Sequence, residues 1–169
     1  TICCVARLAP QKRYDVLLDA LVLLRESATN FRCLVAGQDR LNGWFQERVV
    51  ELELAEHVVY LGPWEDVPSL LASSDIFVLT SDNEGCPNAM LEAMSTGLPI
   101  VATRSGSEEF LVEGQTGFVV PIGDAQAVAE RLACLMGDED LRLHMGAAAR
   151  EWIIQNAALD SMLASYFKL

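Results

Sequence analysis

The sequence predicts an α/β fold, a Rossmann-like doubly wound parallel sheet of about six strands with helices on both faces. Short apolar runs alternate along the chain with longer segments of helical periodicity. This alternation is typical of right-handed βαβ crossovers, which build a parallel sheet. A length of 169 residues fits about one domain of this kind.

Strands are expected where short runs are rich in Val, Ile, Leu and Phe, because the strands of such a sheet are covered on both faces. The run 76–79 is apolar at every position, and Gly97, Leu98 and Pro99 separate a helical segment from the next buried run. The expected strands are 2–6, 32–36, 57–60, 76–79, 99–102 and 117–120.

Helices are expected where apolar residues recur at intervals of three and four positions. In segment 14–27, Leu17, Leu21 and Leu24 fall on one face, which we expect to pack on the sheet. The expected helices are 14–27, 43–54, 67–73, 88–96, 107–112, 124–136 and 139–155, and 159–169 is a last amphipathic stretch.

Composition excludes several classes of protein. The chain carries 24 acidic and 12 basic residues, a net charge of -12, which disfavours nucleic-acid binding. No apolar run is long enough to span a bilayer, and no metal-ligand spacing appears. Three of the five cysteines, Cys3, Cys4 and Cys33, fall in expected strands. Together with their odd number, this indicates buried thiols in a reducing compartment.

The most informative segment, 81–103, predicts an anion site. A buried strand is followed by a loop with Glu84 and Gly85, and then by a helix that begins near Asn88 and carries Glu92. In such units the free N–H groups and the positive end of the helix dipole point into the crevice at the carboxyl ends of the strands. Gly85 would let the backbone approach a phosphate closely.

The two carboxylates of this segment are expected to bind hydroxyls. Like charges about 4 Å apart repel by about 1–4 kcal/mol, so Glu84 and Glu92 are poor partners for a phosphate. A nucleotide diphosphate sugar fits, because its pyrophosphate lies between two polyols. In the alternative interpretation, Glu84 is a solvated loop residue and Glu92 a favourable helix-dipole charge. Spacing alone leaves both open.

A second candidate segment is 7–13, which follows the first expected strand. Three of the 12 basic residues, Arg7, Lys12 and Arg13, fall within these seven positions. A local basic cluster is needed here, because the net charge of -12 repels a pyrophosphate at long range. Arg7 and Lys12 could supply that cluster. The alternative is that both are ordinary surface bases in a loop.

Together the two segments resemble the retaining glycosyltransferases of the GT-B fold, in particular family 4, the glycosyl transferases group 1. The resemblance rests on Arg7 and Lys12, on Glu84 and Glu92 with their flanking residues, and on weaker similarity along nearly the whole chain. It implies that Arg7 and Lys12 face the donor pyrophosphate, Glu84 the donor sugar and Glu92 the ribose. The expected catalytic residues are Arg7, Lys12 and Glu84, and the expected donor-binding residues are Gly85, Asn88, Ala89, Met90 and Glu92.

The resemblance also implies a function for the chain. Residues 1–169 would form the C-terminal nucleotide-sugar-binding domain of a hexosyltransferase whose N-terminal acceptor domain is absent from this chain. The donor would be a UDP- or GDP-sugar, used without a metal or other cofactor in polysaccharide or glycoconjugate biosynthesis. We expect a cytoplasmic location or one at the cytoplasmic face of a membrane, with membrane contact only through the missing domain. The chain alone is expected to be inactive.

Two alternatives stay open at this point. One is a fragment of an enzyme like the glycogen or starch synthases, and the other is a non-catalytic nucleotide-binding or interaction module. One loop also departs from the family pattern of paired glycines followed by a glutamate, because segment 104–109 contains only Gly106 before Glu108 and Glu109. The departure leaves the sugar and the role of Glu109 open. Both glutamates could equally supply charge at the start of a short helix.

Overall fold

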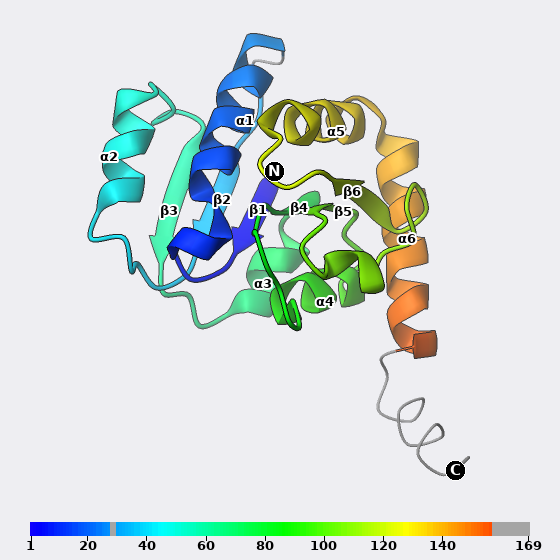
Figure 1. Cartoon of the computed structure of the whole chain (residues 1–169). Helices are drawn as coiled ribbons and strands as arrows, with labels where there is room; N and C mark the ends of the chain where they lie inside the picture. Colours follow the sequence, from blue (N-terminus) through cyan, green and yellow to red (C-terminus); the bar gives the residue numbers. More distant parts are fainter. Residues whose placement is uncertain (28–29, 157–169) are drawn as a thin grey trace.

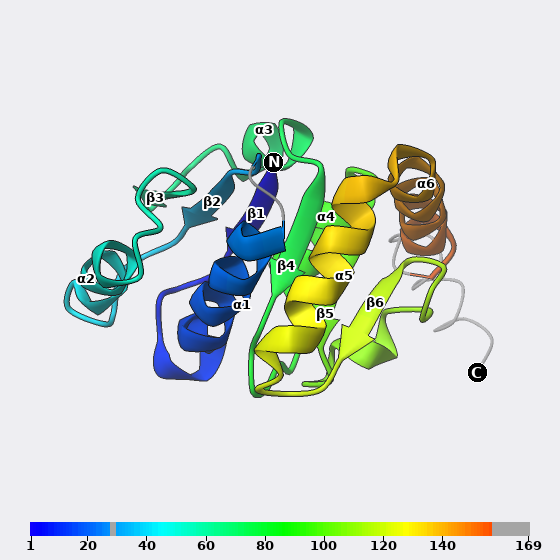
Figure 2. The same cartoon turned by 90° about the horizontal axis from the view of Figure 1, so that it is seen from above.

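Six strands pair in parallel in the order β3-β2-β1-β4-β5-β6. The computed structural model describes residues 1–27 and 30–156 and has the predicted Rossmann-like α/β architecture, with helices on both faces of the sheet (Figures 1 and 2). The strands are β1 Ile2–Val5, β2 Cys33–Ala36, β3 Val58–Gly62, β4 Ile76–Leu79, β5 Ile100–Thr103 and β6 Gly117–Val120.

The helices follow the predicted periodicity closely, and the first has the predicted bounds. They are α1 Tyr14–Ser27, α2 Trp44–Glu51, α3 Val67–Ala72, α4 Asn88–Ser95, α5 Ala125–Gly137 and α6 Glu139–Asn156, with short 3-10 helices at Pro10–Lys12 and Ser107–Glu109. The amphipathic stretch 159–169 lies outside the described residues. Among the described helices, none has the length and apolar character needed to cross a membrane.

The predicted helix 107–112 is wrong, because only the single 3-10 turn Ser107–Glu109 forms there. Hydrogen bonds between Thr116 and the backbone of Val112 explain the difference. The N–H of Val112 donates to the Thr116 hydroxyl over 2.8 Å, and the N–H of Thr116 donates back to the Val112 carbonyl over 3.0 Å. A side chain that bonds nearby backbone in this way competes with helix formation, so the chain turns towards β6 instead.

Two apolar cores lie on opposite faces of the sheet, because successive strand residues point to opposite sides. In β1, Ile2 and Cys4 belong to the core packed by α1, α2 and α5, whereas Cys3 belongs to the core packed by α3, α4 and α6. The same alternation separates Ile76 from Phe77 in β4. Burying one such side chain stabilises the fold by about 1.5–3 kcal/mol.

The five thiols divide into a buried and an exposed class. Cys3, Cys4 and Cys33 are buried as predicted, while Cys86 and Cys134 are exposed. Burial raises the pKa of the Cys4 thiol to about 11 and that of Cys3 to about 12, so neither forms thiolate at pH 8.

We therefore expect a thiol reagent such as DTNB to modify two cysteines of the native chain at pH 8 and all five after denaturation. Mass spectrometry of the labelled peptides identifies the reacting positions. Labelling of Cys3, Cys4 or Cys33 at the rate of Cys86 would contradict the burial of the first two strands.

Candidate functional site

The site lies where the strand order reverses. From the neighbouring strands β1 and β4 the chain continues to β2 on one side and to β5 on the other, which opens a crevice at the carboxyl ends of the strands. Hydrogen bonds to backbone carbonyls help to hold the β1–α1 and β4–α4 loops together. The Asp82 N–H donates to the Gln11 carbonyl over 2.8 Å, and the Thr80 hydroxyl donates to the Lys12 carbonyl over 3.0 Å.

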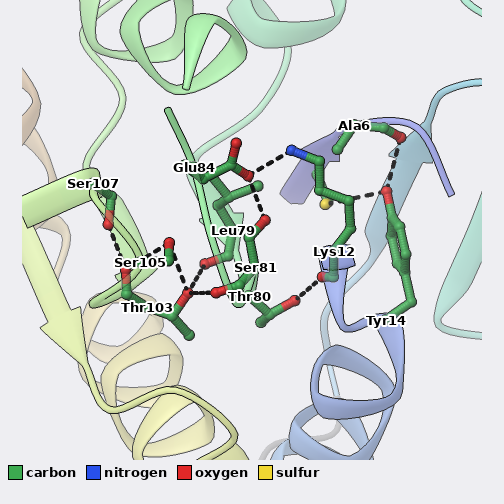
Figure 3. A network of polar contacts seen from close by, with 11 residues as sticks. Ala6, Lys12, Tyr14, Leu79, Thr80, Ser81, Glu84, Thr103, Ser105 and Ser107 are labelled. Atoms are coloured by element: carbon green, nitrogen blue, oxygen red, sulfur yellow. Dashed lines mark hydrogen bonds and ion pairs between the residues drawn. The ribbon is translucent and has the colours of Figure 1, made fainter. Parts of the chain in front are cut away.

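Lys12 and Glu84 meet across this crevice. Figure 3 shows the Lys12 ammonium directed at the Glu84 carboxylate, and the Nζ–Oε1 distance is 2.5 Å. The side chains are only 16% and 8% exposed. The Ser81 hydroxyl donates to the same carboxylate oxygen. Within the described part of the chain no donor reaches Oε2 of Glu84, so that oxygen can accept a hydrogen bond from a ligand.

Buried hydroxyl groups beneath Glu84 were missed by the sequence analysis. The Thr103 hydroxyl donates to the Ser81 carbonyl over 2.5 Å and the Ser107 hydroxyl donates to the Thr103 carbonyl (Figure 3). The Glu84 N–H donates to the Ser105 carbonyl over 2.6 Å. Such networks fix the position of the groups they support. The sequence did contain a signal for this network, because serine and threonine residues stand directly at the ends of the buried strands β4 and β5.

The loop that departs from the family pattern therefore holds Glu84 in place. Glu84 is bonded to this loop through the Ser105 carbonyl, and Ser105 and Ser107 are buried. Glu108 bonds the N–H of Gly106 over 2.8 Å, and Glu109 is exposed on the same short turn. Glu108 and Glu109, which were expected at the start of a longer helix, thus lie on a single 3-10 turn next to the site.

A pocket of about 200 Å³ brings together most of the predicted residues. Of the eight, the pocket is lined by Arg7, Lys12, Glu84, Asn88, Ala89 and Met90. Met90 is fully buried in the core, so it lies behind the residues that form the pocket surface. Arg7 is exposed and forms no ion pair within the described residues, which leaves its charge available to an anion.

Gly85 and Glu92 do not line this pocket. Glu92 is exposed on α4, about one turn after the helix begins. Gly85 is exposed in the loop, and a Cβ added to it would meet nothing within 4 Å. Nothing in the fold itself requires glycine there. The roles assigned to both residues stay predictions.

The first turn of α4 faces the same pocket and lacks a side-chain cap. Pro87 occupies the N-cap position, and no side chain bonds the first N–H groups. The N–H of Asn88 donates to the Cys86 carbonyl and that of Met90 to the Pro87 carbonyl, which leaves the N–H of Ala89 without a partner among the described residues. This N–H and the helix dipole favour an anion at this end. Together with Arg7, they give the pocket a positive side in a chain with a net charge of -12. Among the described residues no group of His, Cys, Asp and Glu side chains could hold a metal ion.

Similarity to known proteins shows the family of this chain. Residues 1–152 match the family model described as glycosyl transferases group 1. The chain belongs to this family. One group 1 relative is the GDP-mannose-dependent alpha-(1-6)-phosphatidylinositol monomannoside mannosyltransferase of Mycolicibacterium smegmatis. It is 33% identical to this chain over 165 residues, which cover 92% of this chain and 43% of that protein.

A second group 1 relative carries a different name. The N-acetyl-alpha-D-glucosaminyl L-malate synthase of Bacillus anthracis is 34% identical over 119 residues, which cover 70% of this chain and 31% of that protein. The chain therefore spans less than half the length of both relatives. Among solved structures, a mutant of TarM from S. aureus in complex with UDP and other ligands superposes with a TM-score of 0.92 at 23% identity, covering 99% of this chain and 34% of that one. That likeness shows the GT-B-type fold.

Proposed function

We propose that this chain is the C-terminal, donor-binding domain of a retaining family 4 glycosyltransferase. The enzyme would transfer a sugar from a nucleotide diphosphate sugar to an acceptor hydroxyl in polysaccharide or glycoconjugate biosynthesis. The observation that carries the proposal is the meeting of Lys12 and Glu84 at the crevice between β1 and β4, beside Arg7 and the uncapped start of α4. This crevice is where open parallel sheets bind their ligands.

Each group of the pocket has a chemical task in this proposal. Arg7, Lys12 and the N–H of Ala89 at the start of α4 would bind the diphosphate and stabilise the charge that develops on it as the glycosidic bond breaks. A metal ion is not required for that charge. Oε2 of Glu84 would accept a hydrogen bond from the donor sugar, and Glu92 would accept one from the ribose. The ion pair of Lys12 and Glu84 keeps both side chains ordered before the donor arrives, which lowers the entropic cost of binding.

The relatives support a guanosine or uridine nucleotide. The mycobacterial relative depends on GDP-mannose, and the S. aureus neighbour was crystallised with UDP. Because the chain spans 43% and 31% of its two relatives, we place the acceptor-binding domain in the rest of a longer protein. The chain alone would bind donor weakly and transfer no sugar at a useful rate, because the reacting groups would not be held together. We place the protein in the cytoplasm or at the cytoplasmic face of a membrane.

Calorimetric titration tests the donor site. We expect saturable binding of one nucleotide among UDP, GDP and ADP, or of its sugar conjugate, and weaker binding by the Arg7→Ala and Glu92→Ala variants. Circular dichroism confirms that the variants are folded. Affinities equal to that of the unaltered chain would remove Arg7 and Glu92 from the site. Binding without sugar transfer by the longer protein would favour a non-catalytic module.

The alkylation rates of two cysteines provide an independent test of the same site. Cys86 is exposed and lines the pocket, while Cys134 is exposed on α5. A bound nucleotide diphosphate should therefore slow the alkylation of Cys86 and leave the rate at Cys134 unchanged. Equal rates at both thiols in saturating nucleotide would place the nucleotide elsewhere on the chain.

A further inference from the structure

A second and larger pocket lies on the α1 and α2 side of the loops that hold Lys12 and Glu84. Its volume is about 920 Å³, within the range of about 300–1,000 Å³ that is typical of small-molecule sites. Lys12 and Glu84 line the smaller pocket, whereas Arg13 and Asp82 line the larger one. The same two loops therefore form a wall between the pockets.

Ion pairs hold the polar groups of this wall. Nη1 of Arg13 lies 2.9 Å from Oδ1 of Asp82, and Nη2 lies 2.8 Å from Oδ2 of Asp15. Arg13 makes these contacts from a left-handed backbone conformation, with φ 48°. Hydrogen bonding to the Arg13 guanidinium also lowers the pKa of the Asp15 carboxyl. Both carboxylates are thus hydrogen-bond acceptors held in defined positions.

The charges that line the larger pocket cancel. Arg13 and Arg40 are balanced by Asp15 and Asp82, and the amides of Gln11 and Asn42 add neutral donors and acceptors. This balance contrasts with the net charge of -12 of the chain. Two carboxylates disfavour a phosphate, and the arginines disfavour a cation. The pocket is therefore suited to a neutral ligand with many hydroxyl groups.

An exposed indole provides an apolar surface in the same pocket. Trp44 is the first residue of α2 and is 36% exposed. The Asp39 carboxylate fixes the preceding loop by accepting from the N–H groups of Leu41 and Gly43, over 2.7 and 2.8 Å. An indole combines a large apolar surface with little conformational freedom. The C–H groups on one face of a pyranose ring can pack on such a surface, while its hydroxyls reach carboxylates and amides.

We propose that the larger pocket binds a neutral saccharide that belongs to the acceptor or to the growing glycan. The saccharide would pack on Trp44 and donate hydrogen bonds to Asp15 and Asp82. Identifying the saccharide as part of the acceptor rests on the proposed function, because it assumes that sugar transfer takes place at the neighbouring smaller pocket. Saccharide binding itself depends only on the lining of the pocket.

The indole resonances of the 15N-labelled chain test the proposal. The chain has three tryptophans, and only Trp44 lines the pocket, while Trp64 and Trp152 lie outside it. We would titrate the chain with methyl α-D-mannopyranoside, methyl α-D-glucopyranoside, the corresponding N-acetylglucosaminide and maltose. We expect at least one of them to shift the Trp44 indole signal saturably and to leave those of Trp64 and Trp152 unchanged.

Two variants make the test specific. Trp44→Ala should weaken saccharide binding by about tenfold or more, since it removes the stacking surface, and it should leave nucleotide affinity unchanged. Trp64→Ala is the matched control, because Trp64 is similarly exposed and lies after β3. Binding by the Trp44→Ala variant is followed on the amide signals of residues 40–42.

The outcomes separate this proposal from the proposed function. Absence of a saturable shift with all four saccharides, or an equal loss of binding in the Trp64→Ala variant, would overturn the saccharide pocket. Nucleotide binding is measured on the same samples. A chain that binds a saccharide at Trp44 but no nucleotide would retain the pocket and count against the donor site, and the reverse result would count against the pocket alone.

Discussion

Replacing Lys12 with alanine is expected to weaken the binding of a nucleotide diphosphate by about 10- to 100-fold. This factor corresponds to the loss of a hydrogen bond to a charged group, which contributes about 1.5–3 kcal/mol. The side chain is nearly buried and already directed into the pocket. Its loss removes a cation that no neighbouring base replaces at the same position. Isothermal titration of the chain measures the affinity, and kcat/KM of the proposed longer enzyme should fall by a similar factor.

The same substitution also affects the fold. Without Lys12, Glu84 keeps the Ser81 hydroxyl but loses its counter-charge in a position that is 8% exposed. We expect the free energy of unfolding to fall by about 1–3 kcal/mol, so affinities must be compared at equal folded fractions.

Arg32→Ala is the control for lost charge. It also removes one positive charge, but Arg32 is exposed and precedes β2, at the opposite edge of the sheet from the pocket. If both variants bound the nucleotide with equal affinity, the assignment of Lys12 to the diphosphate would be wrong.

Gly106→Ala is expected to lower the free energy of unfolding by about 2–4 kcal/mol, because backbone strain and a steric clash add at this position. Gly106 has a φ of 106°, which side chains rarely adopt, and a Cβ there would lie 2.2 Å from the Glu84 carbonyl oxygen. Relief of that clash requires movement of Glu84 itself. Nucleotide-sugar binding should therefore fall together with stability, as measured by chemical denaturation and calorimetry.

Gly85→Ala is the matched variant in the facing loop. A Cβ at Gly85 meets nothing within 4 Å of the chain, so we expect stability to change by no more than about 0.5 kcal/mol. If Gly85 lies against the diphosphate, affinity for the donor falls without any loss of stability. A Gly106→Ala chain as stable as Gly85→Ala would show that the two loops do not meet as the structure places them.

Hydrophobic periodicity was enough to predict the architecture. The apolar pattern of segment 14–27 favours a helix packed on one face, and the short apolar run 76–79 favours a strand covered on both faces. Local competition between hydrogen bonds was not visible in the pattern. Helix 107–112 was expected from its helical pattern, yet the Thr116 hydroxyl accepts a hydrogen bond from the N–H of Val112, and only one turn forms.

The candidate site was predicted in part. Arg7, Lys12, Glu84 and Asn88 follow the ends of strands that are neighbours in the sheet, and the structure gathers them at one pocket. Their mutual contacts could not be predicted, because the ion pair joins residues 72 positions apart. The Thr103 hydroxyl was missed for the same reason, because it bonds the Ser81 carbonyl 22 positions away. The Ser81 and Ser107 hydroxyls bond partners only three and four positions away, but the loop conformations that bring these groups together depend on the packing of the strand ends.

The sequence by itself determined the α/β class, the order of most elements and the residue types at the carboxyl edge of the sheet, because these depend on periodicity and on chain order. Tertiary structure alone decided that Lys12 pairs with Glu84, that Gly85 and Glu92 lie outside the smaller pocket, and that Arg13 and Asp82 line a larger one. The physical reason is distance. Ion pairs and pockets depend on side-chain positions set by packing between remote segments, and local patterns carry no information about these.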